Sequence, residues 1–433
     1  MMRRIDVAQL QIMHSLSTSD IYMLDLDINC QERIFDYLTS GDCIHTPQTC
    51  LHCVKAFQDL SAMNDGKIRI DGSSEYFKSQ FLLFCIGCEF IKDLFIDIGD
   101  LSHFLKSLSC SERNSFFASL SKKLKSMNNL EQVQFFLFGE LHKTWNMELF
   151  EESLLSLKEL PKLRSVIIDV DGCSVKNILH LKRLEKITFR HKVSLYDLIG
   201  CCKANKNLQA LHVNKLMILA QTQLTDIIAY CNKLEELHFE AEGTDYADLA
   251  RLPNLKKLVV SATSCGSLFE LFKALGKAQQ LQYLPIIGKV SPDDIEEIVG
   301  IKSLRHLSCC FSDMQCIEQL SSLTELEVLE INIDKCDIIP PALLNVLKAC
   351  KLLRVLFIQG PVWVKDFLNS AREVLQEVRN PLEQKPLQVK IVALDWFISE
   401  LEDNFLVASI QRPACYDNDE SPPQGCFNFK FKF

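Results

Sequence analysis

The chain has 433 residues, of which 48% are hydrophobic and 24% are charged, as in a folded soluble protein. Its formal net charge of −9 at pH 7 argues against a duplex nucleic-acid binder, because neutralising phosphates requires clustered lysine and arginine. The longest uncharged apolar run, Phe81 to Cys88, is far too short to span a membrane.

The 19 cysteines bear on the cellular compartment. In a secreted chain they would suggest disulfides, yet the N-terminal stretch MMRRIDVAQLQIMHSL lacks the continuous apolar core and small-residue cleavage site of a signal peptide. We therefore expect reduced cysteines that serve as small buried residues, in a protein of the cytoplasm, the nucleus or both.

The N-terminal part of the chain is not repetitive. Residues 1–23 are mixed and polar, and we expect a flexible N-terminus there. In residues 24–60, Cys30, Ile34 and Leu38 form a helical apolar stripe, and Thr46-Pro47 is typical of the start of a second helix. Two or three short helices bury too little surface to fold robustly alone, so this segment should pack on a larger body.

From residue 61 to residue 411 an apolar-x-x-apolar-x-apolar frame recurs. It is clearest at Leu234, Leu237 and Phe239, directly after the helical stripe from Leu224 to Cys231. The frames begin at Ile91, Leu130, Leu163, Leu184, Leu208, Leu234, Leu255, Leu281, Leu304, Leu326 and Leu353, with Val389, Val392 and Leu394 as a degenerate last copy. From Leu163 onward the frames start 21 to 27 residues apart, which is typical of leucine-rich repeats.

This pattern predicts an α/β leucine-rich-repeat solenoid over residues 61–411, a horseshoe with a parallel concave sheet and outer helices. The first repeats are irregular, since the frames at Ile91, Leu130 and Leu163 are 39 and 33 residues apart. A long helix is expected over residues 362–378, followed by a last strand and a short helix over roughly 388–410.

The C-terminal tail, residues 412–433, has a different composition. An acidic stretch and a Pro-Pro pair precede Phe427, Phe429, Phe431 and Phe433, which alternate with polar residues. Alternation of this kind indicates a strand with one apolar face.

Residues 24–60 resemble an F-box, the short helical motif that binds the adaptor of a ubiquitin ligase. The positions in register with that motif are Leu26, Cys30, Ile34, Phe35, Tyr37, Leu38, Asp42, Ile44 and Cys50. Asp27 stands where the motif usually has proline. The repeats also resemble the cysteine-containing type that accompanies F-boxes, because Cys231 and Cys350 each lie three residues before a frame.

The resemblance implies a substrate receptor of an SCF-type cullin ubiquitin ligase. The adaptor contact would fall on Leu26, Ile34, Phe35 and Leu38. The repeats would hold a protein substrate for ubiquitination, and the chain itself would perform no covalent step. The alternative is a leucine-rich-repeat scaffold or inhibitor, whose N-terminal helices only cap the solenoid.

The sequence contains no P-loop, no GxSxG and no HExxH motif, so we expect a non-catalytic protein without a cofactor. Thiol and imidazole groups that could hold zinc gather at Cys43, His45, Cys50, His52 and Cys53, and a further CxxC lies at Cys85 and Cys88. Because the CxxC lies in an apolar helix and Cys50 fits the F-box register, we favour buried thiols over a metal site.

In each predicted strand the frame residues face the core, so the intervening positions face the concave side. These positions are polar in the middle repeats and turn apolar from the Leu255 repeat onward. The predicted substrate-binding residues are Val259, Tyr283, Ile287, Val328, Val355 and Phe357. A contiguous apolar patch there indicates an interface, covered either by a substrate or by the chain's own Phe427–Phe433 segment. The remaining alternative is that irregular loops break up the patch.

Overall fold

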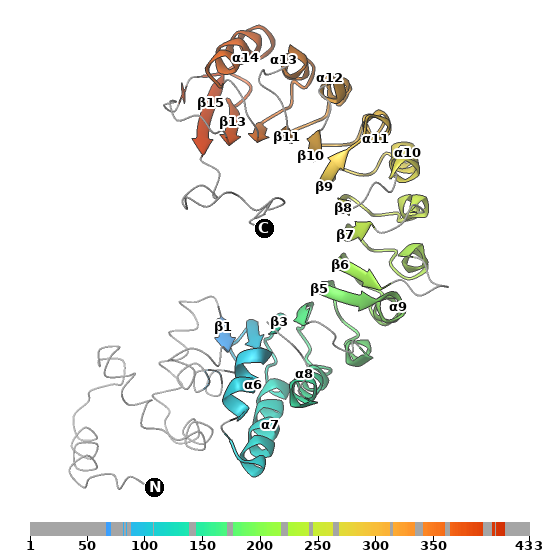
Figure 1. Cartoon of the computed structure of the whole chain (residues 1–433), viewed down its shortest axis with the longest axis vertical. Coiled ribbons are helices and arrows are strands. Elements are labelled where there is room, and N and C mark those ends of the chain that lie inside the picture. Colours follow the sequence, from blue (N-terminus) through green and yellow to red (C-terminus); the bar gives the residue numbers. More distant parts are fainter. Residues whose placement is uncertain are drawn as a thin grey trace, which may run out of the picture. The chain divides into compact units, whose positions relative to one another are not determined.

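The computed structural model describes residues 66–70, 81, 84, 88–106, 108–137, 144–170, 176–217, 224–241, 246–262, 268–311, 315–333, 341–359, 364–392, 401–402 and 404–411. The chain divides into two compact units, residues 1–223 and residues 224–433. In each unit the strands lie side by side on one face and the helices pack on the other (Figure 1). The expected flexible N-terminus, the F-box-like segment and the C-terminal tail lie outside the described residues.

The first unit contains six strands that pair in chain order, all of them parallel. They are β1 (Lys67–Ile70), β2 (Asp93–Asp97), β3 (Gln132–Leu137), β4 (Ser165–Val170), β5 (Lys186–Ser194) and β6 (Ala210–Met217). The connections contain the helices α6 (Ile98–Lys106), α7 (Cys110–Lys125), α8 (Thr144–Ser156) and α9 (Leu195–Ala204) and the 3-10 helix η3 (Lys176–His180).

The second unit continues the same alternation. Its parallel strands are β7 (Glu236–Ala241), β8 (Lys257–Ala262), β9 (Tyr283–Val290), β10 (His306–Phe311), β11 (Val328–Ile333), β12 (Val355–Gln359), β13 (Leu387–Val392) and β15 (Leu406–Gln411). The two-residue strand β14 (Leu401–Glu402) pairs antiparallel with β15.

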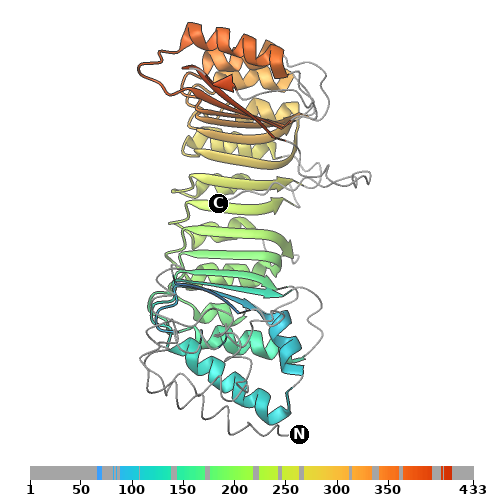
Figure 2. The same ribbon diagram turned by 90° about the vertical axis from the view of Figure 1, so that its left-hand side faces the viewer.

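The outer elements of the second unit change in kind along the chain. They are the 3-10 helices η4 (Leu224–Ala229), η5 (Ala247–Arg251) and η6 (Leu320–Ser322) and the α-helices α10 (Phe269–Ala278), α11 (Pro292–Ile298), α12 (Gln315–Gln319), α13 (Pro341–Ala349) and α14 (Val364–Val378). Figure 2 shows the strands of this unit in front of their helices. The long helix predicted over residues 362–378 is confirmed as α14.

The predicted frames form the core of both units. Leu234, Leu237 and Phe239 are fully buried, and the first residues of the other frames are at most 3% exposed from Ile91 to Leu353. Because each repeat can bury these side chains only against its neighbours, the sheet and helix layers of each unit have one continuous core. The predicted leucine-rich-repeat fold is therefore confirmed.

The predicted start of the last repeat was wrong. Leu356 and Ile358 are the second and third apolar residues of the frame that begins at Leu353. Val389 pairs with Leu356, and Ile391 pairs with Ile358. The last frame therefore starts at Pro386, three residues earlier than predicted, and Val389 and Ile391 are its buried strand residues. The prediction failed because a proline fills the first apolar position. The strand β15 takes part of the region where we expected a short helix.

The starts of α7 and α11 follow ordinary capping rules. Ser109 begins α7, where its side chain accepts a hydrogen bond from the Glu112 N–H and the Glu112 carboxylate accepts one from the Ser109 N–H. Ser291 caps α11, and Pro292 takes the first helical position. None of the helices in the described part of the chain is long and apolar enough to cross a membrane.

Candidate functional site

The open face is the face of the second unit's sheet that the helices leave uncovered. It carries alternate residues of the strands β7 to β13 and β15. Tyr283 and Ile287 on β9, Val328 on β11, and Val355 and Phe357 on β12 lie on it, and all five are partly exposed. Val259 on β8 shares the face, but it is only 4% exposed.

The register gathers three of the predicted residues into an apolar patch. Val328 pairs directly with Val355, and Phe357 lies beside Val355 on the same face of β12. Neighbours across parallel strands are about 4.8 Å apart, so their side chains cover adjoining surface. Val259 is separated from this patch by β9 and β10. Its short side chain lies beside the larger His238, which is its partner in the register.

A row of charged and aromatic side chains crosses the strands next to the patch. The Lys257 Nζ atom lies 2.8 Å from Glu236 Oε1 and 4.8 Å from the centre of the Tyr283 ring. The Tyr283 and His306 rings are in contact, with their centres 4.0 Å apart. His306 Nε2 is buried and lies 3.7 Å from Glu330 Oε1, an ion-pair distance rather than a hydrogen bond.

Electrostatics in this row favour the ionised form of Glu330. Burial alone would raise the pKa of Glu330, but the neighbouring His306, the Ser308 hydroxyl and the charge of Lys390 outweigh it and lower that pKa. Burial, together with the negative charges of Glu330 and Glu236, raises the pKa of the Tyr283 phenol to about 12. Glu330 therefore favours its ionised, carboxylate form on the open face.

Sequence reasoning did not single out His306 and Glu330. They occupy the third and fifth positions of their frames, where polar residues are common, and only the pairing of β10 with β11 brings them together. A signal was available, because the third position of one frame and the fifth position of the next are diagonal neighbours on paired strands.

The uncovered face of the first unit's sheet combines polar contacts with rings. Gln132 donates to the Asp93 carboxylate, and its side-chain oxygen accepts a hydrogen bond from Ser165. Near this ladder, the Arg69 guanidinium lies 4.4 Å from the centre of the Phe95 ring. Phe95 is partly exposed, so apolar groups on the open positions are not confined to the second unit.

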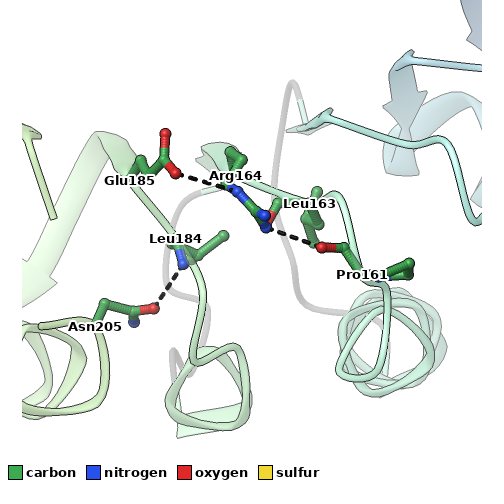
Figure 3. A network of polar contacts seen from close by, with 6 residues as sticks. All are labelled: Pro161, Leu163, Arg164, Leu184, Glu185 and Asn205. Atoms are coloured by element: carbon green, nitrogen blue, oxygen red, sulfur yellow. Dashed lines mark hydrogen bonds and ion pairs between the residues drawn. The ribbon is translucent and has the colours of Figure 1, made fainter. Parts of the chain in front are cut away.

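The turns before the strands are tied together by a separate network, drawn in Figure 3. Arg164 Nε lies 3.1 Å from Glu185 Oε1, and the Arg164 guanidinium also donates to the carbonyls of Pro161 and Leu163. Asn205 accepts a hydrogen bond of 2.9 Å from the buried Leu184 N–H. The Arg164–Glu185 and Leu184–Asn205 contacts join successive repeats, whereas the bonds to Pro161 and Leu163 are local.

The predicted adaptor-binding residues Leu26, Ile34, Phe35 and Leu38 lie outside the described residues, as do Cys43, His45, Cys50, His52, Cys53 and Cys85. Cys231 and Cys350 are buried free thiols, as predicted. Burial raises the pKa of the Cys350 thiol to about 11, which keeps it protonated and unreactive. The described residues contain no group of three or more His, Cys, Asp or Glu side chains that could hold a metal ion.

No protein-family model matches the sequence, and no curated protein matches it significantly. Among solved structures, the chain is similar to internalin C2 of Listeria monocytogenes, with 14% identity over 54% of this chain and 83% of that chain and a TM-score of 0.29. A TLR13–ssRNA13 complex shows 16% identity over 64% and 44% of the two chains, with a TM-score of 0.35.

A protein of Bacteroides fragilis shows 15% identity over 69% of this chain and 75% of its own length, with a TM-score of 0.32. At such identities and TM-scores these structures say nothing about what the present chain binds.

Proposed function

We propose that this chain is a non-catalytic binding protein and that a protein partner docks on the open face of the second unit. The observation that carries the proposal is the exposure of Tyr283, Val328, Val355 and Phe357 on a face that the repeats do not need to bury. Partly exposed aromatic and aliphatic groups gathered in one place are typical of protein interfaces.

We further propose that the partner is a substrate and that the chain is the recognition subunit of an SCF-type ubiquitin ligase. Support comes from the resemblance of residues 24–60 to an F-box directly before leucine-rich repeats. Leu26, Ile34, Phe35 and Leu38 would contact the adaptor, which links the chain to the cullin. The chain would then act by proximity, because holding the substrate raises the effective concentration of its lysines at the transfer site. The buried free thiols favour a reducing compartment, the cytoplasm or the nucleus.

The adaptor part is tested by co-precipitation of the full chain with purified adaptor and cullin. The parent chain should retain both, and the double variant Ile34→Ala/Phe35→Ala should lose both while its circular dichroism spectrum stays unchanged. By helical periodicity Phe35 falls beside the predicted Ile34/Leu38 stripe, so a segment that only caps the repeats would have less use for it. Failure of the parent to bind, or full binding by the variant, would leave the scaffold or inhibitor as the better interpretation.

The docking part needs a second pair of variants. Tyr283→Ser/Phe357→Ser should lose the substrate and keep the adaptor. Leu382→Ser is the matched control, because Leu382 is 94% exposed but lies in the turn before β13, outside the open face. Equal substrate binding by Tyr283→Ser/Phe357→Ser and by the control would place the binding surface elsewhere.

A further inference from the structure

One carboxylate lies next to the apolar patch of the open face. Glu330 on β11 pairs with Ser308 on one side and with Phe357 on the other. Val328 precedes it on the same face of the strand, beside Val355. The Glu330 side chain is 27% exposed, so a group from another molecule can reach it.

Glu330 is only loosely paired among the described residues. Its ion pair with His306 is long, 3.7 Å between Nε2 and Oε1. Lys257 is closely paired with Glu236 at 2.8 Å. Lys390 is exposed and lies two strands away, beyond Phe357.

These surroundings discriminate between partner side chains. A purely apolar side chain would desolvate the Glu330 carboxylate without replacing its hydration, which is unfavourable. An acidic side chain would be repelled. A lysine or arginine would place its methylene groups on Val328 and Val355 and its charge on the carboxylate. An arginine would also lay its guanidinium plane on the Phe357 ring.

We infer that Glu330 and the patch of Val328, Val355 and Phe357 form a recognition site for a basic side chain, arginine or lysine, flanked by apolar residues in the partner's sequence. The inference rests on the proposed docking function and adds the chemistry of the partner.

The experiment uses the full chain and a phage-displayed library of random peptides of about twelve residues. Peptides enriched on the parent chain, relative to an unrelated immobilised protein, should carry arginine or lysine between apolar residues. Binding of the synthesised peptides is then measured on Glu330→Gln, an isosteric change that removes only the charge. We expect a loss of about tenfold or more and a weaker dependence of affinity on salt. Glu325→Gln is the control, because Glu325 is exposed in the turn before β11 of the same repeat.

Charge reversal gives a second, independent measurement. Replacing the peptide's basic residue by glutamate should abolish binding to the parent and restore it on Glu330→Lys, which a merely structural role of Glu330 would not produce. Melting temperatures of all variants, compared with the parent, establish that they are folded.

The other outcomes are distinct. Peptides that lack basic residues, or that bind Glu330→Gln as well as the parent, overturn the inference. If those peptides still fail to bind Tyr283→Ser/Phe357→Ser, the proposed docking function is retained without the basic-residue inference. If they bind that variant as well as the parent, the proposed docking site is also wrong. Absence of enrichment on the parent also overturns the inference.

The chain's own tail is the other possible occupant, because it carries Lys430 and Lys432 between phenylalanines. If deleting residues 413–433 is required for the peptides to bind, the occupant is the chain's own tail and the partner inference is overturned.

Discussion

Asn205 offers a direct test of how successive repeats are joined. Three residues before a frame, other repeats bury apolar groups such as Leu252, Cys231 and Cys350, but here a fully buried asparagine takes that position. Its side-chain oxygen accepts a hydrogen bond from Leu184 N–H at 2.9 Å, and its amide group donates to the Cys201 carbonyl at 3.0 Å (Figure 3 shows the bond to Leu184). Replacement of Asn205 by alanine removes both bonds.

The expected loss of stability follows from the backbone groups that lose a hydrogen bond in Asn205→Ala. At the frames that begin at Leu130, Leu208, Leu234, Leu255, Leu304, Leu326 and Leu353, the N–H of the first apolar residue donates to the carbonyl three residues earlier. At Leu184 the acceptor is instead the Asn205 side chain, so alanine leaves a buried donor unsatisfied, at about 1–3 kcal/mol. The Cys201 carbonyl keeps its bond from the Asn205 backbone N–H, so this end loses about 1 kcal/mol or less. We expect the free energy of unfolding to fall by about 1–4 kcal/mol in total.

Urea unfolding of the full chain, followed by circular dichroism and by tryptophan fluorescence, measures this loss. Asn254→Ala is the control, because Asn254 makes one exposed side-chain bond to the Asn232 carbonyl. Asn254→Ala should lower the free energy of unfolding by less than about 1 kcal/mol. If Asn205→Ala is as mild as Asn254→Ala, Leu184 N–H has another acceptor, and the reasoning about inter-repeat bonding is wrong.

Four further outcomes are expected. With chelator and reductant present, the purified chain should hold no stoichiometric zinc and keep its melting temperature; loss of one zinc together with stability would instead place a metal at Cys43–Cys53. Deletion of residues 413–433 should leave the chain monomeric in sedimentation if a substrate covers the open face, whereas self-association would indicate that the tail covers it. Tyr283 should titrate near pH 12 by ultraviolet absorbance, and Glu330→Gln should lower that pKa because it removes a negative charge. The folded pKa of Glu330 lies below its ordinary value of about 4.5, so its stabilising contribution is present above pH 4.5 and is lost as the pH falls through the folded pKa. The difference in free energy of unfolding between the parent and Glu330→Gln should therefore shrink on acidification.

Most of the fold could be predicted because the frames encode burial directly. A solenoid repeat must fill the same inward positions in every copy, so the apolar pattern recurs at a constant spacing. The prediction failed where that requirement was met differently. Pro386 hides the start of the last frame, and the short strand β1 shows only Ile70 as a fully buried position.

The candidate site was predictable only in part. Alternation places Tyr283, Val328, Val355 and Phe357 on the uncovered face, but alternation says nothing about how deeply a short side chain lies among its neighbours. Val259 is buried there. The charged partners of the site were missed, because charge on an open strand position is ordinary and gives no local signal.

The ion pair of His306 with Glu330 shows that binding chemistry in such a chain depends on residues of neighbouring repeats. The two residues lie on successive repeats, more than twenty residues apart in sequence, and the sheet brings their side chains to 3.7 Å. A shift of one residue in the register of β11 would turn Glu330 into the core and Leu329 out of it. The buried frame therefore fixes, residue by residue, which exposed side chains can act together. The frames of successive repeats, aligned on their buried leucines, place Lys257, Tyr283 and His306 in one column and Ser308, Glu330, Phe357 and Lys390 in the next. The specificity of the open face should accordingly depend on these columns, so a substitution within them should change partner binding, whereas the same substitution at the turns before the strands should change stability alone.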